Sequence, residues 1–201
     1  MEYSTTFAAG TLLYDESLQV LEAAGTTEKI EEVSDDVLDI RSQSGRERRL
    51  MEVKRRLGAV EQDVLRDFLE LSSAEQKVVL YYAAIKAYPL VHDLHMHVVL
   101  LAWRSIMQEV HRADIQRFLD GRADNHPEID AWSESTLDKV QQVFRKMLRE
   151  VGLLTADEKL QALHLPSSFW ARFVRAGDLW FLEAMLVEKE VRETAVQIVR
   201  S

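Results

Sequence analysis

Seven cationic side chains lie in the seventeen residues "RSQSGRERRLMEVKRRL", from Arg41 to Leu57, and only Glu47 and Glu52 oppose them. The net charge of this segment is therefore +5. Most of the cations are arginines, whose planar guanidinium group donates two parallel hydrogen bonds to a phosphate. The segment is a candidate phosphate-binding surface, made of Arg41, Arg46, Arg48, Arg49, Lys54, Arg55 and Arg56.

The charge of the remaining chain offers a second explanation for these arginines. Residues 1–40 carry ten acids and one lysine, whereas residues 41–201 carry 24 acids and 24 bases. The excess of −9 therefore resides entirely in the first 40 residues. The arginines can pair with this acidic segment and hold it in place. A third explanation is a solvated helix face, which is the usual position of a charged run.

A second cationic group lies in "STLDKVQQVFRKMLREVG", which has the apolar spacing of a helix over residues 135–151. The side chains opposite its apolar face include Lys139, Arg145, Lys146 and Arg149. A cationic helix followed by "GLL" is typical of the recognition helix in winged-helix DNA-binding domains. Any capped amphipathic helix that ends in glycine shares this pattern, so it indicates a nucleic-acid contact only in combination with other features.

Catalytic and metal-binding signatures are missing from the sequence. His92 and His95 share a helix face and, with Asp93 or Asp114, could ligate a metal. No HExxH pattern accompanies them, and a histidine-rich core helix that also carries His97 is the favoured interpretation. The chain has no cysteine, no GxSxG, no P-loop and no GxGxxG. We therefore predict no catalytic residues, no metal, no cofactor and no small-molecule substrate.

The elements that position these residues are predicted to be helices, because apolar residues recur at helical spacing and glycine and proline are few. A first helix is expected from Asp15 to Ala24. Capping boxes are expected at Ser44 with Glu47 and at Ser72 with Glu75. The second of these begins a helix that must end near Pro89.

The centre of the fold is predicted in the two apolar helices on either side of Pro89, with Leu100, Leu101, Trp103 and Ile106 in the core. The segment "GLLTADEKLQALHLP" is compatible with a hairpin or with a turn and a helix, and Thr155 with Glu158 favours the helix. The loop-like "DGRADNHPEID" divides an N-terminal helical bundle, 1–122, from a C-terminal helical lobe, 130–201, although the two can also pack as one domain.

The compartment follows from what the chain lacks. Without cysteine it suits a reducing cytoplasm. Its N-terminus, "MEYSTTFAAG", shows no signal peptide, and its longest apolar runs are much shorter than the roughly 20 residues of a membrane span. We predict a cytoplasmic protein with no membrane contact.

Several stretches in their order along the chain resemble the BrxA family, a small component of BREX phage-defence systems. They are "YSTTFAAGTLLYDESLQVLE", "RSQSGRERRLMEVKRRL", "VLYYAAIKAYPLVHDL" and "WSESTLDKVQQVFRKMLREVGLL". The resemblance implies a mainly helical accessory protein with a fold like that of the RNA-binding antitermination factor NusB, and it implies DNA binding. It supplies no catalytic residues.

Two functions are compatible with the sequence. The first is a non-enzymatic accessory protein that binds DNA, or less readily RNA, through its basic helix faces. The second is an adaptor that docks onto larger BREX subunits, in which case the arginines have a structural role. Arginines exposed together on one face favour the first function, and arginines packed against residues 15–40 favour the second.

Overall fold

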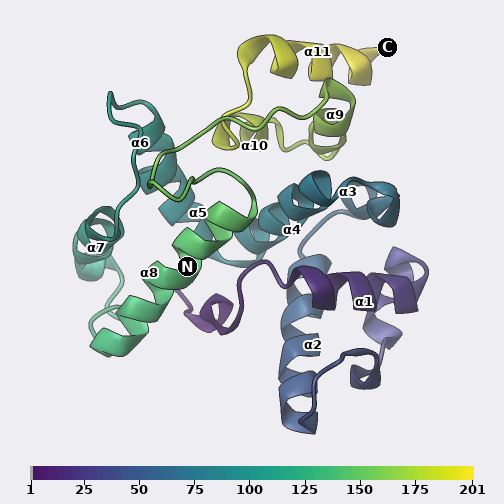
Figure 1. The fold of residues 1–201 in the computed structure, drawn as a ribbon, viewed down its shortest axis with the longest axis horizontal. Helices are drawn as coiled ribbons and strands as arrows, with labels where there is room; N and C mark the ends of the chain where they lie inside the picture. The colour runs from purple at the N-terminus through teal and green to yellow at the C-terminus, as the bar shows by residue number, and fades with distance from the viewer. Residues whose placement is uncertain (1) are drawn as a thin grey trace. The chain divides into compact units, whose positions relative to one another are not determined.

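The computed structural model describes residues 2–201, and within them every regular element is a helix (Figure 1). The only β-type pairings in this range are two isolated bridges, Glu109 with Lys159 and Leu154 with Leu160. The predicted all-α class is therefore confirmed. The helices over residues 43–58 and 134–150 bury one stripe of side chains, as their apolar spacing predicts, whereas the helix over residues 73–87 is buried on nearly all sides.

Contacts between Cα atoms divide the chain into two compact units. One unit is Leu12–Ala87, and the other combines the N-terminal segment up to Thr11 with Tyr88–Ser201. The predicted division into a bundle, 1–122, and a lobe, 130–201, was drawn from loop composition and stays a prediction. The likeness to NusB also stays a prediction.

The unit Leu12–Ala87 is built around three helices, with α2 packed against both α1 and α4. Short helical turns, α3 and the 3-10 turns, connect them. Its elements are α1 (Tyr14–Ala24), η2 (Thr27–Glu32), η3 (Asp35–Val37), α2 (Gln43–Gly58), α3 (Gln62–Leu65), η4 (Phe68–Glu70) and α4 (Ser73–Ala87). The predicted first helix is confirmed, and it stops at Gly25, whose φ of 66° favours glycine.

The two predicted capping boxes have different outcomes. The box before α4 is confirmed, because Ser72 N–H donates to Glu75 Oε2 (2.9 Å) and Glu75 N–H donates to Ser72 Oγ (3.4 Å). The box at Ser44 with Glu47 is wrong. Helix α2 already begins at Gln43, and Ser42 is its N-cap, with Oγ accepting from Gly45 N–H (3.2 Å).

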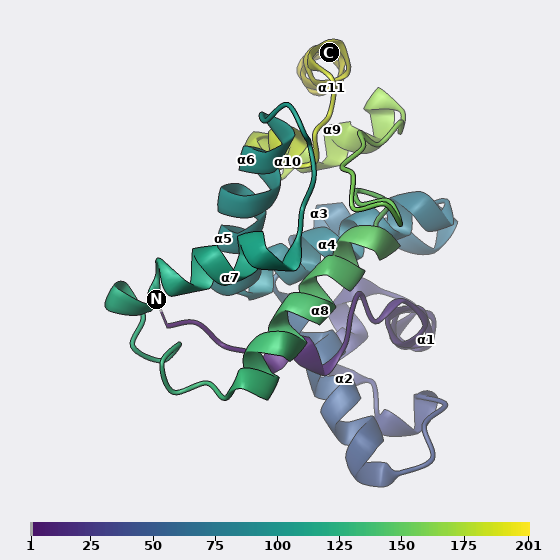
Figure 2. The same ribbon diagram turned by 60° about the vertical axis from the view of Figure 1, so that its left-hand side comes forward.

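The second unit contains the remaining helices (Figures 1 and 2). They are η1 (Thr6–Ala9), α5 (Pro89–Leu94), the π-helical turn η5 (His95–Val99), α6 (Leu100–Trp103), α7 (Arg112–Asp120), η6 (Ala123–Asn125), α8 (Glu134–Glu150), α9 (Ser167–Arg175), α10 (Leu179–Ala184) and α11 (Lys189–Arg200). Helix α8 packs against α7 and η1, and α11 packs along α9. Pro89 begins α5, as its fixed φ and missing N–H allow at a first helical position.

A π turn changes the core that the sequence predicts after Pro89. Leu100 N–H donates to the carbonyl of His95, five residues back, so the turn holds one extra residue. The side chains beyond it are rotated by roughly 100° relative to a regular helix. Leu100 stays buried, but Leu101 is 67% exposed, so its predicted place in the core is wrong.

The end of this helix accounts for the other misplaced core residues. Helix α6 stops at Trp103, which is only half-buried, and Ser105 Oγ then accepts from Gln108 N–H (3.2 Å). Ile106 lies in the connecting turn and is fully exposed, so its predicted burial is also wrong. Some of the apolar side chains between Leu100 and Ile106 are therefore exposed on the surface.

The segment after α8 is a hairpin, and the favoured helix over Thr155–Glu158 is wrong. Thr155 N–H donates to the Lys159 carbonyl (2.9 Å), and Gln161 N–H donates to the Leu153 carbonyl (3.0 Å). Three leucines of the hairpin, Leu153, Leu154 and Leu160, are buried. Leu154 and Leu160 form an antiparallel β-bridge, so residues 155–159 connect two paired segments and do not form a helical turn.

In the described part of the chain, no helix combines the length and apolar content that crossing a bilayer requires.

The position of the core can be tested with two leucines on the same helical segment. Leu94→Ala removes a fully buried side chain from α5 and should lower the free energy of unfolding by about 2–5 kcal/mol. Leu101→Ala removes an exposed side chain and should change it by less than about 0.5 kcal/mol. Urea unfolding of both variants measures the difference. Equal losses would show that the π turn does not set the register.

Candidate nucleic-acid interface

The candidate surface on α2 is only partly available, because several of its cations bind the acidic segment. Arg46 Nε donates to Asp35 Oδ2 (2.9 Å), and its Nη1 donates to the carbonyl of Ile40 (3.1 Å). Arg49 Nε lies 3.5 Å from Glu16 Oε1 on α1. These contacts correspond to the internal pairing that the charge distribution suggests.

Two further cations of α2 are also engaged. Lys54 Nζ donates to the carbonyl of Glu31 (2.6 Å), which fixes η2 against the helix. Arg56 is buried, and its Nε donates to Glu52 Oε1 (2.7 Å) one turn earlier. A buried guanidinium cannot contact a phosphate in solution without unfolding its surroundings. Its predicted role as a phosphate ligand is therefore incompatible with this position.

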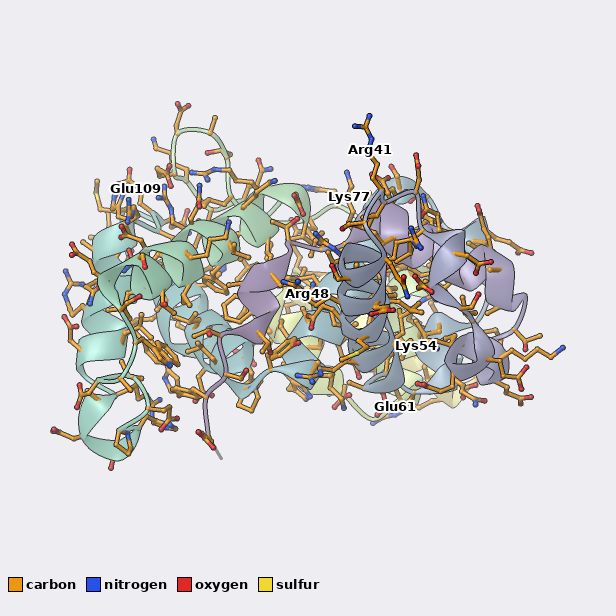
Figure 3. The ribbon with its side chains drawn as sticks, turned by 90° about the horizontal axis from the view of Figure 1, so that it is seen from below. Arg41, Arg48, Lys54, Glu61, Lys77 and Glu109 are labelled. Carbon is orange, nitrogen blue, oxygen red and sulfur yellow. The ribbon has the colours of Figure 1, made fainter. Side chains whose placement is uncertain are left out.

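Arg41, Arg48 and Arg55 are the exposed cations of the cluster. Arg41 extends away from the ribbon (Figure 3). Within residues 2–201, neither Arg41 nor Arg48 has an ion pair or a side-chain hydrogen bond. The exposed part of the candidate surface thus consists of Arg48 and Arg55 on α2 and Arg41 just before it.

The outer face of α8 presents a second cationic row. Lys139, Gln142, Lys146 and Arg149 are all exposed and follow each other at intervals of three or four residues, which places them in one stripe. The opposite face is buried through Val140, Phe144 and Met147, among others. Ser133 caps the helix by accepting from Thr136 N–H (3.2 Å). The burial of one face therefore fixes the direction of the cations.

Two arginines of α8 converge on one carboxylate, that of Glu158 in the hairpin. Arg149 Nη2 donates to Glu158 Oε1 (2.5 Å), and Arg145 pairs with Oε2. Partial burial alone would raise the pKa of Glu158, but the hydrogen bond and charge of Arg145, together with the charge of Arg149, lower it overall. Glu158 is therefore ionised at neutral pH.

The hairpin also pairs with the chain before α7. Val110 N–H donates to the carbonyl of Glu158 (3.1 Å), and Leu160 N–H donates to the carbonyl of Gln108 (2.7 Å). Along the chain, α6 is followed by a short extended segment at residues 108–110, then by α7, α8 and the hairpin (Figure 2). This is the order of elements in a winged helix, with α8 in the place of the recognition helix.

Glu158 is the residue of this region that the sequence analysis missed as a partner of α8. The pattern "LLTADEKLQ", with apolar residues on both sides of a polar turn, was the available signal for a hairpin. No signal connected Glu158 to Arg145, because the pairing depends on the hairpin folding back along α8.

The histidine group is dispersed among separate partners. His95 is buried, and its Nε2 lies 2.6 Å from the carbonyl of Ala184 at the end of α10. His92 Nδ1 lies 3.0 Å from Asp93 Oδ1, and His97 stacks with Phe118. No group of three potential ligands gathers around a metal position among residues 2–201.

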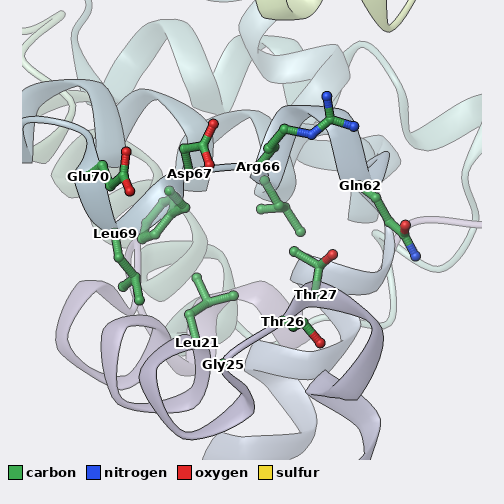
Figure 4. Close-up of a pocket in the computed structure, with 11 residues that line it drawn as sticks. Leu21, Gly25, Thr26, Thr27, Gln62, Arg66, Asp67, Leu69 and Glu70 are labelled. Carbon is green, nitrogen blue, oxygen red and sulfur yellow. The ribbon is translucent and has the colours of Figure 1, made fainter.

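A hollow of about 370 Å³ lies in the unit Leu12–Ala87, between the end of α1 and the turn that precedes α4 (Figure 4). Its lining includes the carboxylates of Asp67 and Glu70 and a single arginine, Arg66. Arg66 pairs with Asp63 (2.5 Å). The excess of acid makes this hollow unsuitable for a phosphate group.

Comparison with known proteins places these observations in a family. The BrxA family model matches residues 1–176. The search of curated proteins finds no match. A crystal structure of an uncharacterized protein from Magnetospirillum magneticum is similar, with a TM-score of 0.73 and 19% sequence identity over 93% of this chain and 99% of the other. At this identity, the likeness concerns the fold alone.

The structural role of the α2 arginines can be tested with Arg56 and Arg48. Arg56→Ala leaves Glu52 buried without the guanidinium and should lower the free energy of unfolding by about 3–5 kcal/mol. Arg48→Ala, on the exposed face of the same helix, should change it by less than about 0.5 kcal/mol. Denaturant titration measures both. A small effect of Arg56→Ala would contradict its assignment as a structural residue.

The buried His95 predicts a dependence of stability on pH. Burial, and to a lesser extent the charge of His92, lowers the pKa of His95 to about 4 against the bond to Ala184. Because the unfolded chain binds a proton near pH 6.5 and the folded one does not, stability is complete above this pH and falls toward pH 4.

Between pH 7 and pH 5, the loss from His95 should be about 2 kcal/mol. His95→Gln keeps a donor for the Ala184 carbonyl and should remove this part of the pH dependence. The exposed His164→Gln is the control and should retain it. Urea unfolding at the two pH values gives the comparison, and identical pH dependence in both variants would exclude His95 as the cause.

Proposed function

The chain belongs to the BrxA family of BREX-associated phage-defence proteins, and on that basis we propose that it is a non-enzymatic accessory protein that binds DNA through the outer face of α8. The observation that carries this proposal is the exposed stripe of Lys139, Gln142, Lys146 and Arg149. The stripe lies on the helix that has the recognition position in a winged-helix order of elements.

The chemistry of the stripe favours contacts to the DNA backbone. The lysine ammonium groups are flexible point charges, which neutralise phosphates without reading base edges. Gln142, in the middle of the stripe, carries the only amide, the group that pairs with adenine in a major groove. We therefore expect binding with a strong salt dependence and little base preference.

The neighbourhood of the stripe supports a limited number of phosphate contacts. Asp138 is paired with Arg112 of α7, so its negative charge is compensated. Lys146 has Glu150 3.7 Å away, an exposed i,i+4 pair of small strength. Lys139 has no partner among residues 2–201. Exposed pairs of this kind yield readily to a phosphate.

The adaptor function is the second candidate, and two observations favour it. Arg46, Arg49 and Lys54 hold the acidic segment, which gives the α2 cations a structural use. In the other unit, Ile106 and Met107 expose apolar side chains, as protein-binding surfaces do. In this function, the exposed turn after α6 contacts a larger BREX subunit.

The proposal is tested by a charge-matched pair of triple variants. Lys139→Gln with Lys146→Gln and Arg149→Gln removes three charges from α8 at little cost in helix propensity. If all three contact phosphates, the slope of log K against log salt should become shallower by about 2.7 for duplex DNA. Fluorescence anisotropy with duplex DNA and with RNA, at about 50 and 200 mM salt, measures it.

The control removes the same number of charges from α2 and the segment just before it, through Arg48→Gln, Arg55→Gln and Arg41→Gln. If α8 is the interface, this variant should keep the wild-type slope. Loss of binding in the control alone would move the interface to α2. Absence of binding to either nucleic acid by the wild type would favour the adaptor function.

A further inference from the structure

Glu158 has a backbone conformation that few residues other than glycine adopt. Its φ is 65°, in the left-handed region that is strained for a residue other than glycine. Its N–H donates to the Thr155 carbonyl (3.2 Å), and its own carbonyl accepts from Val110. This tight turn directs the carboxylate at the two arginines of α8.

We propose that the Glu158 carboxylate is an internal substitute for a DNA phosphate, and that binding of DNA exchanges this carboxylate for a phosphate on Arg145 and Arg149. The inference rests on the proposed function and specifies its regulation, because the protein then carries a built-in competitor at its own interface.

The geometry of the three side chains fits this exchange. Arg149 contacts one oxygen of Glu158, and Arg145 contacts the other, so a single anion bridges two guanidinium groups one helical turn apart. A phosphodiester likewise has two non-bridging oxygens and carries one negative charge. In addition, Arg145 Nε and Glu158 Oε2 are both buried without a hydrogen-bond partner among residues 2–201. The contact between Arg145 and Glu158 therefore leaves one donor and one acceptor without a partner.

Solvent reaches this group through Arg149 and Glu158, and least through Arg145, whose Nε is buried. The Arg149 side chain is 37% exposed and that of Glu158 is 24% exposed, whereas Arg145 is 14% exposed. Arg149 belongs to the exposed stripe of α8, so a phosphate held by this stripe lies next to the Glu158 carboxylate. The backbone of the hairpin is held by Thr155, Lys159 and Val110, so the side chain of Glu158 can turn away without opening the hairpin.

Neutral pH does not release the competitor. The two arginines keep the pKa of Glu158 low, so the carboxylate stays charged and leaves only when another anion replaces it. The affinity for DNA is consequently reduced, and two arginine contacts contribute less to binding than they would in a free site.

Asp157 provides the matched control for this inference. It precedes Glu158 in the same turn, it is exposed, and it has no contact with a cation in the described part of the chain. Glu158→Gln and Asp157→Asn both remove one negative charge from the hairpin and keep the size of the side chain. Only the first of them removes the competitor.

The experiment measures the affinity of both full-length variants for a 20-base-pair duplex as a function of salt, after a thermal melt has established that each is folded. Glu158→Gln should bind about tenfold more tightly than the wild type, as expected when a charge-assisted contact is gained. Its salt slope should be steeper by about one to two units. Asp157→Asn should change the affinity by less than about threefold, with the wild-type slope.

The other outcomes are also decisive. If Glu158→Gln and Asp157→Asn give the same affinity, Glu158 acts only through general charge and the inference is wrong, while the proposed function stands. If Glu158→Gln binds more weakly, Glu158 positions the arginines for DNA, and the inference is again overturned. If neither the wild type nor any variant binds duplex DNA, the proposed function fails and the inference fails with it.

Discussion

Neutralisation of the acidic N-terminal segment is the constraint on which the unit Leu12–Ala87 depends. The 3-10 turns η2 and η3 are too short to be stable by themselves, and each contributes few buried side chains. Contacts from α2, above all Arg46 with Asp35 and Lys54 with the Glu31 carbonyl, fix them. Helix α2 is cationic because it holds a chain segment that carries the whole net charge of the protein.

The same balance of charge operates in the other unit. Arg145 and Arg149 share Glu158, and Arg112 is paired with Asp138, so most cations near α8 have an acidic partner. Such a surface has a weak long-range field, and under the proposed function its attraction for DNA depends on exchanging ion pairs. This explains how a protein with a net charge of −9 can act on nucleic acid through a limited number of contacts, as the proposed function requires.

The turn after α6 gives the protein a second kind of exposed surface. The π turn at His95–Val99 ends the regular apolar register, and Ile106 and Met107 then face solvent. Contiguous exposed apolar side chains are costly in water, and they are typical of surfaces that bind other proteins. DNA contact through α8 and protein contact through this turn involve different residues, so the two candidate functions do not exclude one another.

The sequence by itself determined the helical class, the helix α8 with its cationic face, the cap of α4 and the family, because these depend on periodicity and local patterns. It could not determine which arginines are free. Arg48 and Arg56 lie eight residues apart on one helix, and only the packing of that helix leaves Arg48 exposed and Arg56 buried. The sequence also led to a wrong position for Leu101, because the π turn that exposes it is not visible in the apolar pattern. It led to a wrong helix over Thr155–Glu158, because the hairpin there pairs with residues 108–110, which are distant in sequence. The contact of Glu158 with α8 was decided in the same way, because the two segments meet only after the hairpin folds.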